Sequence, residues 1–440
     1  MIRKKKIIFI AIIILTIPLG LQIIISTTAE NQIEYWAFCI DWFGQNCTLA
    51  MKNALVENGW NEKHILTMEG EELTEDDFLS GISWLEKHDD SNDIVLIYTC
   101  SHGSQEGLWY NNKISYVEIN EAINKLDSKG VAIFITACHS GSAISYLKKE
   151  GRVIITSCES DTVSGGPFDY LVYHGIAGLA DYMADNNGIV SAEEIYSYID
   201  ANQYGAHIPQ IQDDYHGSLN LAFLSVENRN PDQMQIIQNE YFGCDYCSFA
   251  PYQLIAQSFI PSKTHLDKVK LIVDNYQSAK CPLTVSIKKD LYEDELTSVT
   301  IEADQIINAL GGLVVEFDFE DITVTTGETY YIVCKVEAVE GIEWEPYHFR
   351  GDEIDDEDFY KNGKLFSSFD SGLTWDIYDD GSDYDLVFVT YGYDTNNASF
   401  DLNDADNPSS NSNIILFYAV IVVIFLIGTI AIVLIVVKQR

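Results

Sequence analysis

Four continuous apolar runs in the first half of the chain constrain its fold more than any other feature. They lie at residues 33–40 (IEYWAFCI), 93–100 (DIVLIYTC), 131–137 (VAIFITA) and 152–157 (RVIITS). Stretches with helical periodicity separate them, for example at 46–58, 115–126 and 191–200. Apolar strands that alternate with helices are typical of a mostly parallel sheet with helices on both faces. We therefore expect an α/β sandwich, and we expect it to form a separable domain over residues 30–228.

The pattern changes after residue 228. Residues 229–248 are polar and predict a linker. Short β-branched or aromatic runs follow at 257–260, 269–273, 283–287, 313–319, 330–336 and 386–391. This pattern predicts an all-β sandwich or jelly roll over 249–393. Residues 394–413 lack apolar periodicity and predict a stalk.

Both ends of the chain are apolar. Four basic residues and an uncharged run from Ile7 to Ile25 make residues 1–29 a signal peptide or a signal anchor. Residues 414–437 hold no charge and are long enough to cross a bilayer as a helix. The basic tail at 438–440 predicts a cytoplasmic C-terminus by the positive-inside rule. We therefore expect a single-pass membrane protein with its ectodomain outside the cell, or a two-pass protein if the first segment is uncleaved.

The net charge and the cysteine count limit the partners and the covalent links that the chain is expected to have. A formal net charge of -41 excludes nucleic acid as an expected partner, because phosphate binding needs clustered Lys and Arg. An odd count of nine cysteines leaves at least one thiol unpaired. Cys39 with Cys47, and Cys281 with Cys334, are candidate disulfides for a protein outside the cytoplasm.

Polar residues follow three of the apolar strands. Two of these segments read Ser101-His102-Gly103 and Cys138-His139-Ser140. Since ligands bind at the carboxyl ends of parallel strands, His102 and Cys138 are expected at one edge of the sheet. A partly ionised thiol with a nearby imidazole suits nucleophilic catalysis. The backbone N–H groups of Gly103 and Cys138 are candidates for holding an oxyanion.

Other residues near these strand ends have plainer explanations. Cys100 precedes His102 by two residues and is expected to point into the sheet. Cys158 ends a different strand without the Ser-Gly turn, and His139 should point away from the nucleophile. A cysteine or histidine taken alone is usually structural.

The segments IVLIYTCSHGSQEGLWY (94–110) and VAIFITACHSGSA (131–143) resemble the legumain branch of the caspase-like cysteine peptidases. That family shows an apolar strand followed by His-Gly-Ser, and later an apolar strand followed by Ala-Cys-x-Ser-Gly-Ser. The resemblance covers about residues 33–225. It implies a caspase-like α/β sandwich, peptide hydrolysis, and a catalytic dyad of Cys138 and His102. The segments QSFIPSK (257–263), VTTGETYYIV (324–333) and FVTYG (388–392) resemble, less specifically, galactose-binding-like jelly rolls. This resemblance implies a carbohydrate or cell-surface ligand for the β domain.

The resemblance also bears on specificity. Legumains favour Asn before the cleaved bond and hold it with an Arg-His pair and a Glu, whereas the corresponding places here hold Trp42, Phe43 and Thr136. The acidic residues left nearby are Asp41, Glu159 and Asp161. A carboxylate in a partly desolvated pocket favours a guanidinium or ammonium group. We therefore expect cleavage after Arg or Lys, with Asn as the alternative.

Residues 183–194 match part of an EF-hand calcium loop, with Asp185, Asn187, Gly188, Ser191 and Glu194 at suitable places. The first place, normally Asp, is Met183. Ser191 and Glu194 also form a capping box for the next helix, which explains them without a metal. We expect no cofactor, and calcium is the alternative.

The function that these features favour is a membrane-anchored, extracytoplasmic cysteine endopeptidase acting on peptides or proteins. Two alternatives stay open. One is a transpeptidase of the lipid-anchor transamidase type, since hydrolysis and ligation pass through the same thioester. The other is an inactive cell-surface binding protein whose β domain carries the function.

Overall fold

A computed structural model describes residues 33–109, 112–203, 207–238, 253–275, 280–336, 347–354, 360–378 and 383–394. Within these ranges, no helix has the length and apolar character needed to cross a membrane. The segment expected at 1–29 and the membrane helix expected at 414–437 both lie outside the described residues.

A six-stranded sheet forms the first part of the chain, in the order β10-β8-β7-β3-β1-β2. Five strands are parallel, and β10 joins β8 antiparallel at one edge. The strands are β1 (Tyr35–Asp41), β2 (Ile65–Glu69), β3 (Ile94–Cys100), β7 (Gly130–Thr136), β8 (Arg152–Thr156) and β10 (Gln210–Asp213). All residues of β3, β7 and β8 are buried, which explains why these strands appear in the sequence as unbroken apolar runs.

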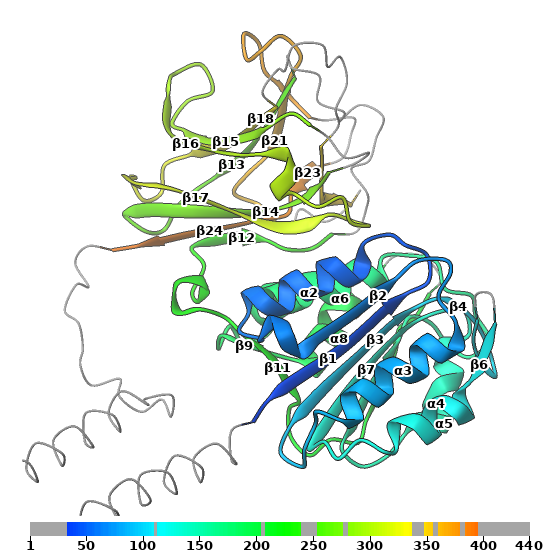
Figure 1. The fold of residues 1–440 in the computed structure, drawn as a ribbon. Helices are drawn as coiled ribbons and strands as arrows, with labels where there is room; N and C mark the ends of the chain where they lie inside the picture. The colour runs from blue at the N-terminus through cyan, green and yellow to red at the C-terminus, as the bar shows by residue number, and fades with distance from the viewer. Residues whose placement is uncertain are drawn as a thin grey trace, which may run out of the picture. The chain divides into compact units, whose positions relative to one another are not determined.

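Helices cover both faces of this sheet (Figure 1). One layer holds α2 (Cys47–Glu57), α6 (Phe168–His174) and α8 (Ala192–Asn202), and the other holds α3 (Glu75–Glu86), α4 (Tyr116–Ile123) and α5 (Ala143–Leu147). Alternate strand residues pack into the two layers: Leu96 and Phe134 belong to the first core, and Ile97 and Ile133 to the second. The expected α/β sandwich is confirmed, and its mostly parallel sheet brings several strand ends to one edge.

Short elements connect these layers. A three-stranded meander follows β3 and consists of β4 (His102–Ser104), β5 (Gly107–Trp109) and β6 (Lys113–Ser115). A π-helical segment (Gly175–Leu179) and α7 (Ala180–Met183) continue α6, and β9 (Ile189–Ser191) pairs with β11 (Asn220–Phe223). The meander was not predicted from the sequence, because strands of three residues are too short to show a period.

The second part of the chain is all-β. One sheet contains β12 (Gln233–Gln235), β24 (Phe388–Tyr393), β14 (His265–Asp274), β17 (Leu313–Thr323) and β19 (His348–Phe349). The other contains β16 (Glu295–Ile301), β15 (Leu283–Lys288), β18 (Tyr330–Val336), β13 (Leu254–Phe259), β21 (Leu365–Ser368) and β22 (Asp376–Ile377). A separate pair joins β20 (Gly351–Ile354) to β23 (Asp383–Leu386). One core cluster takes side chains from both large sheets, for example Phe317 and Ile332, so the two sheets pack as a sandwich.

The start of this β part differs from expectation. Residues 229–248 were expected to be a linker, yet Gln233–Gln235 form β12 and pair antiparallel with β24. The carboxylate of Asp232 also accepts hydrogen bonds from the backbone N–H and the hydroxyl of Ser262. The β part therefore includes residues that precede its expected boundary at 249. The jelly-roll connection pattern and the galactose-binding likeness stay predictions.

The two candidate disulfides, Cys39 with Cys47 and Cys281 with Cys334, are not formed. Cys39, Cys47, Cys281 and Cys334 are all buried, and none of them forms a disulfide with another cysteine that the structure describes. In the pairing of β15 with β18 it is Val285 that faces Cys334, and Cys281 lies four positions earlier in the sequence. The four residues therefore act as small apolar side chains in the two cores. Cys244 and Cys247 lie outside the described residues.

Candidate active site

Cys138 follows the central strand β7 and begins a sharp turn into a helix. His139 has a φ of 60°, in the left-handed region, and the helical residues Ser140–Ser142 and α5 come directly after it. Such a strand-to-helix turn projects the residue before it from the edge of the sheet. Cys138 is half-buried, and its thiol lies 3.8 Å from the carbonyl oxygen of Ser164.

His102 follows the neighbouring strand β3 and begins β4. It is exposed, and two aromatic rings contact its imidazole. Trp109 stacks on the imidazole, with centroids 4.7 Å apart and an angle of 27° between the planes. Phe43 meets it edge to face at 4.9 Å. These contacts limit the orientations that the imidazole can adopt.

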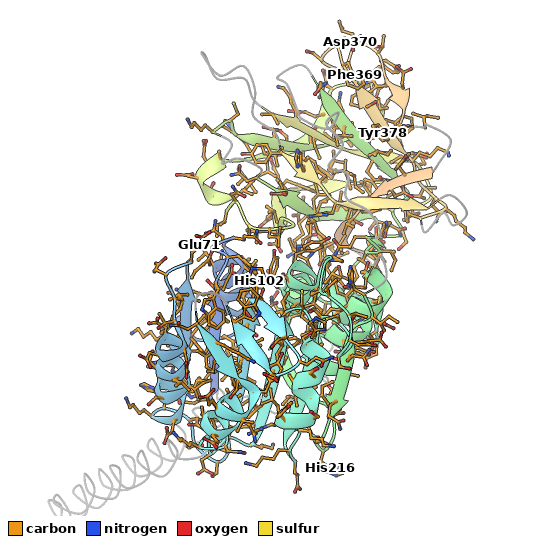
Figure 2. All side chains as sticks on the ribbon, turned by 90° about the vertical axis from the view of Figure 1, so that its right-hand side faces the viewer. Glu71, His102, His216, Phe369, Asp370 and Tyr378 are labelled. Atoms are coloured by element: carbon orange, nitrogen blue, oxygen red, sulfur yellow. The ribbon has the colours of Figure 1, made fainter. Side chains whose placement is uncertain are left out.

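The strand register brings His102 and Cys138 to the same edge of the sheet. Cys100 faces Thr136 in the last pair of β3 and β7, and His102 and Cys138 each lie two residues beyond that pair. A Cβ added to Gly103 would lie 2.3 Å from the carbonyl oxygen of Cys138, so the two chain segments touch here. His102 and His216 lie at opposite ends of the α/β part (Figure 2).

Residues 80–185 match the Peptidase C13 family. This segment contains both His102 and Cys138, and the match confirms the resemblance to legumain-type cysteine peptidases. No curated protein matches the chain.

Two solved structures show the extent of structural likeness. The protein GSU0716 from Geobacter sulfurreducens is 13% identical, with a TM-score of 0.32 over 44% of this chain and 100% of that one. drICE is 12% identical, with a TM-score of 0.32 over 43% of this chain and 92% of that one.

The other thiols of the peptidase C13 segment are buried. Cys100 is 2% exposed, and burial raises the pKa of its thiol well above the usual range. Cys158 is fully buried and donates to the carbonyl oxygens of Ala137 and Thr162. Since the thiolate is the nucleophilic form, neither environment suits a nucleophile. Cys138 is the most accessible cysteine among the seven that the structure describes.

The three expected pocket carboxylates have different environments. Asp41 is completely buried, and its oxygens accept hydrogen bonds from the backbone N–H groups of Phe43 (2.8 Å) and Gln45 (3.1 Å). Burial raises the pKa of this carboxyl group above its usual value. The Asp41 carboxylate therefore holds the backbone of the loop that follows β1. Glu159 is half-buried and Asp161 is exposed, in the segment that passes Cys138, so these two are the accessible carboxylates.

A shallow depression of about 680 Å³ lies beside the turn that carries Cys138. Gln105 and Glu106 line one side, and Ser142, Tyr146 and Ser160 line the other. The carbonyl oxygen of Ser160 accepts hydrogen bonds from the side chains of Gln105 and Ser142, which ties these walls together. The depression is a candidate site for substrate residues beside the cleaved bond.

Three residues that support the strand ends were missed in the sequence. Phe43 and Trp109 hold the imidazole, as described above. Asp169 lies in the first turn of α6, is 6% exposed, and accepts a hydrogen bond of 2.6 Å from the hydroxyl of Tyr98 in β3. An acidic residue at the start of a helix is ordinarily a helix-dipole or capping residue, so its spacing gave no signal of this contact.

The EF-hand-like segment is a capping box in the structure. Ser191 caps α8, and Glu194 bonds back to its N–H, as the simpler interpretation predicts. The structure adds a buried carboxylate that the motif did not include. Oxygens of Asp181, Asp185 and Glu194 lie within 4.8 Å of one another. Both oxygens of Asp181 accept hydrogen bonds from the N–H of Gly188.

We expect Asp169→Asn to change how stability depends on pH. Burial raises the pKa of the Asp169 carboxyl group in the folded state. The folded protein therefore binds this proton more tightly than the unfolded chain, and wild-type stability falls as the pH rises through the raised pKa. The variant lacks this loss, so its Tm relative to wild type should rise from acid to neutral pH in thermal unfolding series.

Asp77→Asn is a control of opposite sign. Hydrogen bonds from Thr74 at the start of α3 hold the pKa of Asp77 below its usual value. That stabilisation is present at neutral pH and is lost on acidification, so Asp77→Asn should lower the Tm most at neutral pH. A Tm difference for Asp169→Asn that does not vary with pH would contradict the assignment.

Proposed function

We propose that the chain is a membrane-anchored cysteine endopeptidase that cleaves peptide bonds outside the cytoplasm. The observation that carries the proposal is the register of β3 and β7. His102 and Cys138 each follow the last residue pair of these strands, Cys100 and Thr136, by two residues. The half-buried thiol, the ring-held imidazole and the match to the Peptidase C13 family support it.

The reaction follows from these two groups. The thiolate of Cys138 attacks the carbonyl carbon of the scissile bond, and the backbone N–H groups of Gly103 and Cys138 stabilise the oxyanion. His102 gives a proton to the departing amine as the C–N bond breaks, which leaves a thioester on Cys138. Water then attacks the thioester while His102 takes its proton. The acid product leaves, and the thiol is restored.

The proposed specificity follows from the accessible carboxylates. Glu159 and Asp161 lie in the segment that passes Cys138, and Asp41 is occupied with its own loop. A carboxylate at the pocket pairs well with a positively charged side chain. We therefore propose cleavage after Arg or Lys, supported by Glu159 and Asp161.

One labelling experiment tests activity, specificity and topology together. Intact cells are treated with thiol-directed peptide probes that cannot cross a membrane and that carry Arg, Lys or Asn at the reactive end. We expect labelling of Cys138 in intact cells, because the basic tail after residues 414–437 predicts an ectodomain outside the cell. Labelling should be fastest with the Arg or Lys probe, because Glu159 and Asp161 favour a positive charge.

The outcomes separate the three parts of the proposal. Absence of Cys138 labelling in cells and in lysate would contradict the peptidase. Labelling only after lysis would contradict the outside location alone. A preference for the Asn probe that Asp161→Ala leaves unchanged would overturn the specificity.

A further inference from the structure

A loop of the β part reaches the α/β part. Residues 308–312, which we call the bridging loop, precede β17 and contain two consecutive glycines in the left-handed region, with φ of +77° at Gly311 and +78° at Gly312. A Cβ added to Gly311 would lie 2.2 Å from Cδ1 of Tyr170 in α6. The close approach therefore needs glycine both for its φ and for its missing side chain.

The bridging loop is bonded to α6 by buried polar groups. Tyr173 donates its hydroxyl proton to the carbonyl oxygen of Leu310, and Nε2 of His174 lies 2.9 Å from the carbonyl oxygen of Gly312. Burial lowers the pKa of His174 to about 3, so its imidazole is neutral near pH 7 and donates through Nε2. Arg350 of the β part lies over the ring of Tyr170 at 4.4 Å and donates from Nε to the carbonyl oxygen of Gly311.

The bridging loop is also bonded to the loop after β1. The N–H of Leu310 donates to the carbonyl oxygen of Gln45 (3.2 Å), and the side-chain amide of Asn46 donates to the carbonyl oxygen of Asn308 (2.6 Å). Gln45 and Asn46 belong to residues 41–46, which we call the first-strand loop. Its other bonds include the internal ones to the Asp41 carboxylate and a bond from the N–H of Asn46 to the Glu69 carboxylate. The N–H of Trp42 also donates to the carbonyl oxygen of Cys100 at the end of β3.

The first-strand loop carries a contact of the catalytic imidazole. Phe43 lies in this loop, and its ring meets His102 edge to face. The N–H of Phe43 and the N–H of Gln45 share the Asp41 carboxylate, so a shift at Gln45 reaches Phe43 through one side chain. The second route runs through α6, where Asp169 holds Tyr98 of β3, the strand that leads to His102.

We propose that the bridging loop is a positioning element of the peptidase, so that the β part sets the orientation of His102 through the first-strand loop and α6. The proposal rests on the proposed function, because it assigns a task at that site. It gives the β part a catalytic support role in addition to any ligand of its own. The bonds of the bridging loop lead to Gln45, Asn46 and α6, so the loop acts on the dyad through these residues.

The test compares two glycine substitutions in the full chain. Gly311→Ala forces a Cβ against Tyr170, whereas Gly327→Ala has a similar φ of +80° and nothing within 4 Å of its Cβ. Both variants bear the same kind of backbone strain, and only the first disturbs the bridging loop. We expect Gly311→Ala to lower kcat about tenfold with little change in KM, because small displacements of a catalytic group are costly.

Alkylation of Cys138 by iodoacetamide, followed by peptide mapping, gives a second readout that needs no substrate. We expect it to slow in Gly311→Ala and to stay at the wild-type rate in Gly327→Ala. Unchanged kcat and alkylation in Gly311→Ala, or equal losses in both variants, would overturn the proposal. If the wild type turns over no peptide, the proposed function fails, and the alkylation rates still decide this inference.

A second variant covers the case in which Gly311→Ala does not fold. Asn46 has a φ of 59°, which glycine adopts freely, so Asn46→Gly removes the amide bonded to Asn308 with little backbone cost. We expect a severalfold loss in kcat and in the alkylation rate, and wild-type values for both would overturn the proposal.

Discussion

Replacing Cys138 with alanine should abolish peptide turnover, and replacing His102 with alanine should lower kcat by about 10²–10⁴-fold, the range that general acid–base catalysis supplies. The two losses should differ because the proposed mechanism forms the covalent bond at Cys138, whereas water can replace part of the proton transfer that it assigns to His102. Turnover of a peptide by each purified ectodomain measures both effects.

Folding controls accompany these variants. His102 is exposed and Cys138 half-buried, so neither truncation opens a cavity in the core, and circular dichroism should match wild type. Cys334→Ala, in the core of the β part, controls for the loss of a thiol far from the strand ends. Near-native turnover by Cys138→Ala would show that the nucleophile is another residue.

Gly103→Ala should reduce kcat/KM by about 10²-fold or more, since misplacing reacting groups by about 1 Å costs that much. The new Cβ would lie 2.3 Å from the carbonyl oxygen of Cys138 and 2.7 Å from the Cβ of Ala137, both in the segment that follows β7. One of the two segments must therefore move. Steady-state kinetics on the purified ectodomain measure the effect.

The adjacent residue provides the control for this substitution. Ser104→Ala changes the same strand, β4, and removes a hydroxyl that donates to the carbonyl oxygen of Gly107 and accepts from the N–H of Glu106. We expect its kcat/KM to stay near wild type. Wild-type kinetics in Gly103→Ala would mean that the two segments have room to separate, and would contradict the close approach.

The site was predictable from the sequence where local pattern determines structure. Strands buried on both faces must be apolar throughout, so β3 and β7 were visible as runs that end near Cys100 and Thr136. The polar residues that follow such strands belong to one edge of the sheet. His102 and Cys138 could therefore be paired from strand pattern and chain order alone.

Contacts between distant segments could not be predicted in this way. Trp109 and Phe43 both contact His102, yet one follows it in the next strand and the other lies in the loop after β1. Asp41 was expected near the substrate because it precedes Trp42 and Phe43, which occupy the places of the legumain Arg-His pair. Its carboxylate instead accepts hydrogen bonds from the backbone of its own loop. Side-chain direction at a strand end depends on the loop that follows, which one sequence does not specify.

Strand register explains the failure of the disulfide prediction. Cys281 precedes β15 by two residues, and Cys334 lies in β18, the strand that pairs with β15. The register that forms sets Val285 opposite Cys334. Register depends on which face of each strand is buried and on the turns between strands, so cysteine positions alone do not determine it.

The pairing of β12 with β24 determines how the chain would carry a mechanical load. Residues 229–232 enter β12 from the α/β part, and residue 394 leaves β24, so tension applied at 228 and 394 pulls on two adjacent antiparallel strands. Gln233 faces Thr390, which puts both pulling points near the same end of the pair. Such a pair opens one hydrogen bond at a time, because the ladder bonds lie perpendicular to the strands. On its other side β24 pairs with β14, from Tyr393 opposite His265 to Phe388 opposite Leu271, so tension at 394 also loads that ladder, beginning at Tyr393.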